Sequence, residues 1–130
     1  MSTPTMSDED KLAFAASYCA ACRTNDGAAL AAMSAPEAVV WHNFDEVEST
    51  MAHTTRALAW LHRNVTDLAW HDVNLKVTSD GFVWQALMTG VASGGALRVH
   101  TCLVVTLDDQ GRLARIDEYV DPAATAVLRG

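Results

Sequence analysis

The chain has 130 residues, half of them hydrophobic, and a formal net charge of −7. This length predicts one domain with a sizeable core, and the acidic balance argues against a nucleic-acid or membrane-surface partner, because a phosphate-binding surface needs clustered Lys and Arg. No apolar run of about 18 residues is present and no charged segment precedes an apolar one, so we expect a cytoplasmic protein without membrane spans.

The first part of the chain predicts a loose tail over residues 1–6 and then a single domain over residues 7–130. Ser7 followed by "DED" is typical of a helix N-terminus, because a serine caps and the acids favour the positive end of the helix dipole. Apolar residues then recur at helical spacing, which predicts a helix over residues 8–23. Within it, Cys19 and Cys22 form "CAAC", which we interpret as buried packing residues and not as a redox or zinc motif.

Two more helices and one strand are expected before residue 67. The letters "TND" predict the start of a short helix that reaches Met33, and a strand should follow over residues 38–43. Ser49 or Thr50 is expected to cap the third helix. His53, His62 and His71 recur every nine residues, which matches no metal-ligand spacing, so we expect no metal ion and no other cofactor.

The hydrophobic period changes from helical to alternating after residue 67. Four strands are expected, separated by "SDG", "SGG" and "DDQG", which are typical of hairpin turns: 68–78, 82–93, 96–107 and 112–121. A short helix is expected after Pro122. The order of elements predicts an α+β fold with three N-terminal helices packed on a curved, mostly antiparallel sheet.

Both faces of the expected strands carry apolar side chains. One face would pack against the helices, but no predicted helix remains to cover the other. A homodimer through this outer face is the simplest way to bury it. The residues assigned to the outer face are Leu87, Val91, Cys102, Val104 and Tyr119.

Three segments in this order resemble the nuclear transport factor 2-like superfamily, which includes ketosteroid isomerase, SnoaL-like polyketide cyclases and limonene-1,2-epoxide hydrolase. The segments are "RTNDGAAL", "VVWHNFD" and "GRLARIDEYVD", and the resemblance covers nearly the whole chain. It implies a cone-shaped fold around an apolar cavity that binds a small hydrophobic molecule. The residues expected to line the cavity are Phe14, Tyr18, Trp41, Trp84, Met88, Leu103 and Ile116.

The resemblance also implies candidate catalytic residues. The epoxide-hydrolase positions that hold a water fall on Trp41, Asn43 and Glu118, and two of these keep the chemistry, because an amide orients water and a carboxylate takes its proton. The helical phenol of ketosteroid isomerase matches Tyr18, and its base falls on His42 or Asn43. The acid partners that either family needs on later strands are missing.

Glu118 is the strongest single candidate, because the alternation of the last strand places it on the cavity side as a general base. Asn43 and His42 compete, since neighbours on a strand point to opposite faces. Two functions therefore stay open. The first is a SnoaL-like enzyme acting by acid/base chemistry on a hydrophobic carbonyl, epoxide or polycyclic substrate, and the second is a binding module that holds such a molecule without chemistry.

Overall fold

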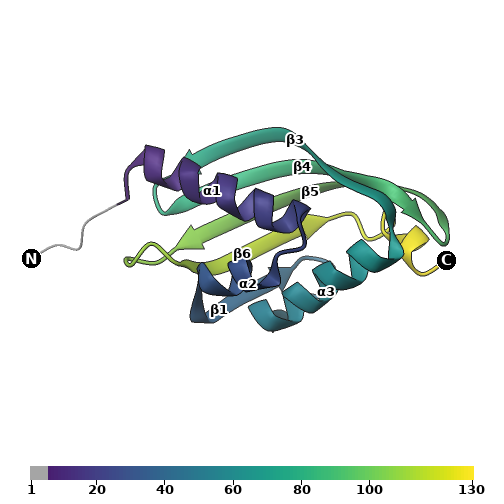
Figure 1. Ribbon diagram of the computed structural model, residues 1–130, viewed down its shortest axis with the longest axis horizontal. Helices are drawn as coiled ribbons and strands as arrows, with labels where there is room; N and C mark the ends of the chain where they lie inside the picture. The colour runs from purple at the N-terminus through teal and green to yellow at the C-terminus, as the bar shows by residue number, and fades with distance from the viewer. Residues whose placement is uncertain (1–5) are drawn as a thin grey trace, which may run out of the picture.

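Three helices lie against one face of a curved six-stranded sheet in this computed structural model, which describes residues 6–130 (Figure 1). The helices are α1 (Asp8–Arg23), α2 (Gly27–Ala32) and α3 (Met51–Asn64), and a short 3-10 helix, η1 (Ala126–Leu128), lies near the C-terminus. The strands are β1 (Ser34–His42), β2 (Glu48–Thr50), β3 (Thr66–Thr78), β4 (Gly81–Ala92), β5 (Gly95–Leu107) and β6 (Leu113–Val120). The predicted α+β cone is confirmed.

Side-chain caps fix where the helices begin. Ser7, Asp26 and Thr50 each accept a hydrogen bond from the backbone N–H three residues further on, at 3.0–3.1 Å. Such caps satisfy N–H groups that have no partner inside the helix. Thr50, and not Ser49, is therefore the cap of α3. The expected tail lies outside the described residues except for Met6, which packs against the core.

The sheet order is β2-β1-β6-β5-β4-β3, so the predicted antiparallel meander supplies four neighbouring strands. β1 lies parallel to β6, and its register places His42 beside Glu118. β1 begins at Ser34, earlier than predicted, although Pro36 lies within it. The pairing with β6 is irregular between Ser34 and Val39, and this irregularity explains how a proline is tolerated there. The three-residue β2 was not predicted.

The inner face of the sheet forms the core with the helices. On β4 the predicted inward row consists of Phe82, Trp84, Ala86 and Met88, and all four are buried. Across from them, α1 contributes buried small residues, including Cys19 and Cys22. Both thiols are unpaired and buried in the core, the position that the sequence favoured.

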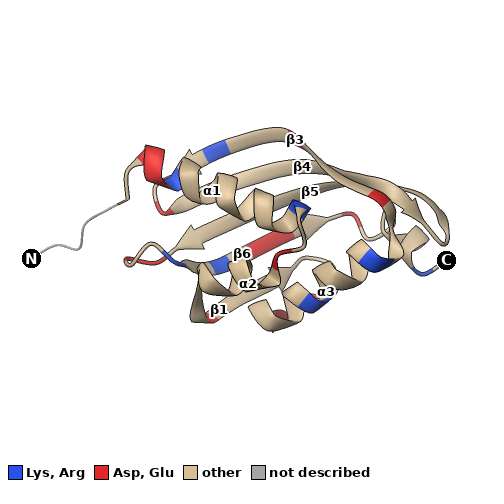
Figure 2. Ribbon diagram, in the orientation of Figure 1, with Lys and Arg blue, Asp and Glu red and all other residues tan. Residues whose placement is uncertain are grey.

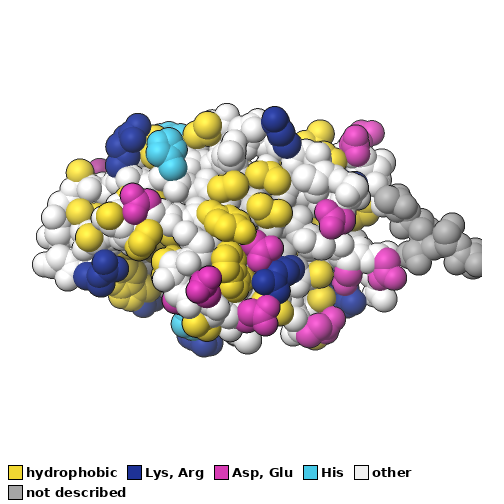
Figure 3. All heavy atoms as spheres, turned by 180° about the vertical axis from the view of Figure 1, so that it is seen from behind, with side chains coloured by type: hydrophobic (Ala, Val, Ile, Leu, Met, Phe, Trp, Pro, Cys, Tyr) yellow, Lys and Arg dark blue, Asp and Glu magenta, His cyan; other side chains and the backbone are white. Residues whose placement is uncertain are grey.

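The outer face of the sheet is open to solvent in a single chain. Figure 3 shows hydrophobic side chains gathered across the middle of this face, with charged groups around them. Val73, Val91 and Tyr119 are 60%, 52% and 46% exposed. Figure 1 shows all three helices on the opposite side of the sheet.

Charged residues are spread thinly over this architecture. Figure 2 shows the basic residues on several separate elements, with no stripe or cluster among the residues drawn in colour. Among residues 6–130, no helix is long and apolar enough to cross a membrane.

Candidate functional site

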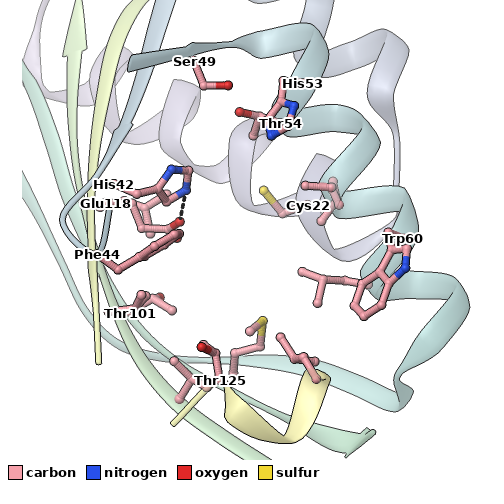
Figure 4. Close-up of a pocket in the computed structure, with 18 of the residues that line it drawn as sticks. Cys22, His42, Phe44, Ser49, His53, Thr54, Trp60, Thr101, Glu118 and Thr125 are labelled. Carbon is pink, nitrogen blue, oxygen red and sulfur yellow. Dashed lines mark ion pairs between the residues drawn. The ribbon is translucent and has the colours of Figure 1, made fainter. Parts of the chain in front are cut away.

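A cavity of about 790 Å³ lies between the inner face of the sheet and the helices (Figure 4). Most of the side chains that line it are apolar. The sheet side is formed by β1, β4, β5 and β6, and α3 closes the opposite side with Leu58, Trp60 and Leu61. η1 and the chain before it close one end. This volume is within the usual range for a small-molecule pocket, and the apolar lining favours a hydrophobic ligand.

Two of the polar side chains that line this largely apolar space contact each other. His42 from β1 and Glu118 from β6 meet with 2.8 Å between Nε2 and Oε1, and their side chains are 21% and 25% exposed. Figure 4 shows both on the sheet side of the cavity, pointing toward one another. The ring of Phe44 lies against His42, with 5.0 Å between the ring centroids. The parallel β1–β6 register therefore brings together two residues that are 76 positions apart in the chain.

The pairing changes the acid–base properties of the imidazole. The hydrogen bond that His42 donates to Glu118 raises the pKa of His42 above its usual value of 6.5, and this effect and the charges of Glu118 and Asp45 outweigh desolvation, which lowers it. Nδ1, the other ring nitrogen, has no hydrogen-bond partner among residues 6–130. When Nε2–H points to Glu118, Nδ1 carries a free lone pair, and the carboxylate stabilises the imidazolium that forms on protonation.

Asn43 does not enter the cavity, so the expectation that its amide faces a ligand is corrected. Its Nδ2 donates to the carbonyl of Val120 at 3.1 Å, and its Oδ1 accepts from the N–H of the same residue at 2.9 Å. Its backbone N–H donates to the carbonyl of Glu118 at 3.1 Å. These bonds use both ends of the amide to lock the end of β1 onto β6. Asn43 therefore positions the strands that carry His42 and Glu118.

Tyr18 lines the cavity from α1, edge-on to Trp84 with 6.1 Å between centroids. Burial, followed by the Cys22 thiol and the charge of Glu118, raises the pKa of Tyr18 well above its usual value. Its phenol therefore stays protonated and can only serve as a neutral donor or acceptor. Burial also raises the pKa of Cys22 to about 12, which makes this cavity-lining thiol a poor nucleophile.

The expected walls divide into two groups. Trp84, Met88 and Leu103 line the cavity, as Tyr18 does. The other three do not, and their assignment is corrected: Trp41 lies on the outer face with its ring 5.5 Å from that of Tyr119, Phe14 packs on Phe82 at 6.2 Å, and Ile116 is buried in the core. The prediction for Trp41 is wrong because His42, the next residue, faces the cavity, and neighbours on a strand point to opposite faces.

Several lining residues were not predicted. Phe44, Val47 and Trp60 surround part of the cavity and are 51%, 54% and 40% exposed. Phe44 and Val47 lie between β1 and β2, where no periodic pattern exists to place a side chain. Thr101 on β5 lies on the inward face that the alternation predicts, yet nothing in the sequence indicates a cavity next to it.

A polar network joins α1, β3 and β4 beside the cavity wall. Oδ1 of Asp72 accepts hydrogen bonds from Arg23 Nη2 and from Trp84 Nε1, each at 2.8 Å. The Arg23 guanidinium, followed by the indole N–H, lowers the pKa of Asp72. Because Asp72 satisfies the only donor of the indole, Trp84 contributes to the cavity as an apolar surface.

Within residues 6–130, no group of three or more His, Cys, Asp or Glu side chains is arranged to hold a metal ion. The candidate site consists of the His42–Glu118 pair, the neutral phenol of Tyr18 and the largely apolar walls, which also carry His53 and several hydroxyl groups.

The fold is shared with solved structures of distant sequence. An NTF2-like protein from Burkholderia thailandensis matches with a TM-score of 0.78 and 16% identity over 92% of this chain and 97% of its own. A candidate SnoaL-like polyketide cyclase from Jannaschia sp. CCS1 matches with a TM-score of 0.77 and 18% identity over 98% and 99%. The BvnE pinacolase from Penicillium brevicompactum matches with a TM-score of 0.76 and 12% identity over 91% and 90%.

No protein-family model matches the sequence, and no curated protein sequence matches it either. The similarity to the solved structures therefore establishes the nuclear transport factor 2-like cone fold, which confirms the resemblance found in the sequence.

Proposed function

We propose that this protein is a SnoaL-like enzyme that uses acid/base chemistry on a small hydrophobic carbonyl, epoxide or polycyclic substrate in the cytoplasm. One observation carries the proposal: the 2.8 Å contact between His42 and Glu118 inside a largely apolar cavity. An ionisable pair is costly to hold away from water, and such pairs occur preferentially at working sites. The cone fold of cyclases and of a pinacolase supports this class of activity.

The two members of the pair take different roles. Nδ1 of His42 is free of hydrogen bonds and accepts the proton of the substrate, whereas Glu118 holds Nε2–H and stabilises the imidazolium. This division modifies the expectation that Glu118 alone is the base. Tyr18 is placed to donate a hydrogen bond to a polar group of the substrate. The chain's own side chains thus supply a base, its conjugate acid and a donor.

The proposal is tested with 2-tetralone, a small ketone whose C1 hydrogens are acidic. In D₂O near neutral pH, the protein should accelerate exchange of these hydrogens for deuterium, followed by NMR. The His42→Asn variant should lose the acceleration, because general acid–base catalysis supplies a factor of roughly 10²–10⁴, and Glu118→Gln should lose about a tenfold part of it. A parent protein that binds 2-tetralone but leaves its exchange at the buffer rate contradicts the proposal.

The second candidate is a module that binds a hydrophobic molecule without chemistry. The largely apolar lining and the engagement of the Asn43 amide in backbone bonds favour it, because they reduce the number of polar groups that can act on a substrate. In that case apolar compounds bind with equal affinity to the parent and to the Glu118→Gln variant. Binding without turnover in both proteins supports this candidate over the enzyme.

We also propose a homodimer through the outer face of the sheet. The apolar patch on this face includes Trp41, Val73, Val91 and Tyr119, and the ion pair of Arg115 with Asp117 lies on the same face. In a two-fold dimer, each copy would cover the patch of the other with the same residues. Sedimentation should give twice the mass of one chain, and a single-chain mass at micromolar concentration contradicts the dimer.

A further inference from the structure

One polar side chain interrupts an apolar row on the floor of the cavity. The inward positions of β5 are Leu97, Val99, Thr101, Leu103, Val105 and Leu107, and all six are buried. Thr101 is the only one with a hydroxyl, is 6% exposed, and lines the cavity. A valine would have the same shape without a polar atom.

The hydroxyl of Thr101 is poorly satisfied within the protein. Its single hydrogen bond runs from Oγ1 to the carbonyl of Ala86 at 3.4 Å. This distance is beyond the usual range for an O–H donor, so the bond is weak. Burying a hydroxyl with a weak partner costs free energy that a valine would not. The hydroxyl is therefore free to turn toward a better acceptor in the cavity.

Thr101 lies close to the acid/base pair on the same face of the sheet. On β5 and β6, Leu103 is opposite Glu118 and Thr101 is opposite Val120, so Thr101 and Glu118 are diagonal neighbours. Diagonal neighbours have Cα atoms about 7–8 Å apart, which leaves room for a small group between their side chains. Figure 4 shows Thr101 and Glu118 on the same wall of the cavity.

The neighbouring strand leaves space above the hydroxyl. Ala86 of β4 lies directly opposite Thr101, between the larger side chains of Trp84 and Met88 on the same inward row. The small side chain of Ala86 therefore gives a ligand access to Thr101.

We infer that the Thr101 hydroxyl binds the carbonyl oxygen of the substrate and selects a hydrophobic ketone or aldehyde among the substrate classes proposed above, an inference that rests on the proposed function. In the reaction, a C–H bond next to the carbonyl breaks and its proton passes to the His42–Glu118 pair. The electron pair moves to the carbonyl oxygen, and the Thr101 O–H stabilises its growing negative charge. The proton then returns to carbon, so no further reactant is needed.

The test compares two ligands of similar shape, 2-tetralone and its hydrocarbon tetralin, by competition against a fluorescent apolar dye. The parent should bind the ketone more tightly than the hydrocarbon by roughly fivefold, the worth of one neutral hydrogen bond. Thr101→Val keeps the shape and should lose this preference, whereas Thr101→Ser keeps the hydroxyl and should retain it. Thr106→Val, the same change on the outward row of β5, should behave as the parent.

Two results overturn the inference: a Thr101→Val variant that still prefers the ketone, or a parent that shows no preference. A thermal melt of each variant confirms folding, and Thr101→Ser provides a second readout should the valine variant melt early. Failure of the proposed function is seen separately. A parent that prefers the ketone but catalyses no proton exchange has the carbonyl site and lacks the acid/base activity. If Thr101→Val exchanges protons at the parent rate, the His42–Glu118 pair acts without Thr101, and the inference about Thr101 is wrong.

Discussion

Two neighbouring carboxylates on β6 show how the faces of one sheet differ. Glu118 points inward to His42, and Asp117 points outward to Arg115, with N···O distances of 2.8 and 2.9 Å. Both carboxylate side chains are 25% exposed, so burial does not separate them. What separates them is the partner and the space beside it. Arg115 remains charged at all ordinary pH values, whereas His42 carries a titratable imidazole with a raised pKa next to a cavity.

The outer pair belongs to a purely structural network. Arg115 also contacts Glu48 of β2 at 2.7 Å, and these two acidic partners raise its pKa further. The guanidinium thus links β2 to β6 across β1 with a fixed charge. A functional carboxylate is consequently recognised here by a titratable partner and an adjacent cavity, and not by its burial or by the length of its hydrogen bond.

The largest expected effect separates the two faces by activity. His42→Asn removes the proton acceptor and should reduce 2-tetralone exchange by at least about 100-fold. Asp117→Asn alters the matched outer pair and should leave the exchange rate within a factor of two or so, because it contacts no part of the cavity. NMR exchange rates of the two variants at one pH check this. Equal losses in both would show that the faces do not differ as described.

The next effect concerns the lock between β1 and β6. Asn43→Ala removes two hydrogen bonds to the backbone of Val120 and should lower the free energy of unfolding by about 2 kcal/mol, since each is worth about 1 kcal/mol. Urea denaturation measures this loss. Asn74 lies on the edge strand β3. Asn74→Ala removes one exposed side-chain hydrogen bond to Gln85 and should lower the free energy of unfolding far less. An Asn43 variant as stable as the parent would exclude the locking role.

The smallest effect is a dependence of stability on pH. Because the folded-state pKa of His42 is raised, the pair contributes its full stability below the unfolded value of about 6.5 and loses it as pH rises through the folded value. The stability difference between the parent and Glu118→Gln should therefore be larger near about pH 6 than near about pH 9.

Asp117→Asn serves as the matched comparison in these denaturation curves. Its partner Arg115 does not titrate in this window, so the difference from the parent should be the same at both pH values. A difference for Glu118→Gln that is larger at the alkaline end would contradict the assigned sign of the His42 shift.

Much of the fold could be predicted because its signals are local. The caps at Ser7 and Asp26, the hairpin turns and the alternating strands depend on residues close together in the chain. The alternation of β6 also predicted that Glu118 points inward, and its side chain lines the cavity. β2 was missed because three residues are too few for a periodic signal, and the loop residue Phe44 has no period at all.

The polar pair could not be predicted, because it depends on a parallel contact between distant strands. The run "AVVW" before His42 is apolar at every position, so no alternation shows which of His42 and Asn43 points inward. The structure settles this through Val40, which is 2% exposed and shares its face with His42. Asn43 turns instead to the end of β6, a choice that only the paired strand can dictate.

The most direct test of the acid/base pair is the pH profile of 2-tetralone exchange in the parent, Glu118→Gln and Asp117→Asn proteins. Because His42 acts in its neutral form, the parent rate should rise with pH through an inflection above 6.5. In Glu118→Gln the inflection should move to lower pH, because the carboxylate that stabilises the imidazolium is gone. The plateau rate should also fall by roughly tenfold, because the orientation and charge that Glu118 supplies to His42 are lost. Asp117→Asn should reproduce the parent profile. Identical profiles for all three proteins would contradict a catalytic role for the His42–Glu118 pair.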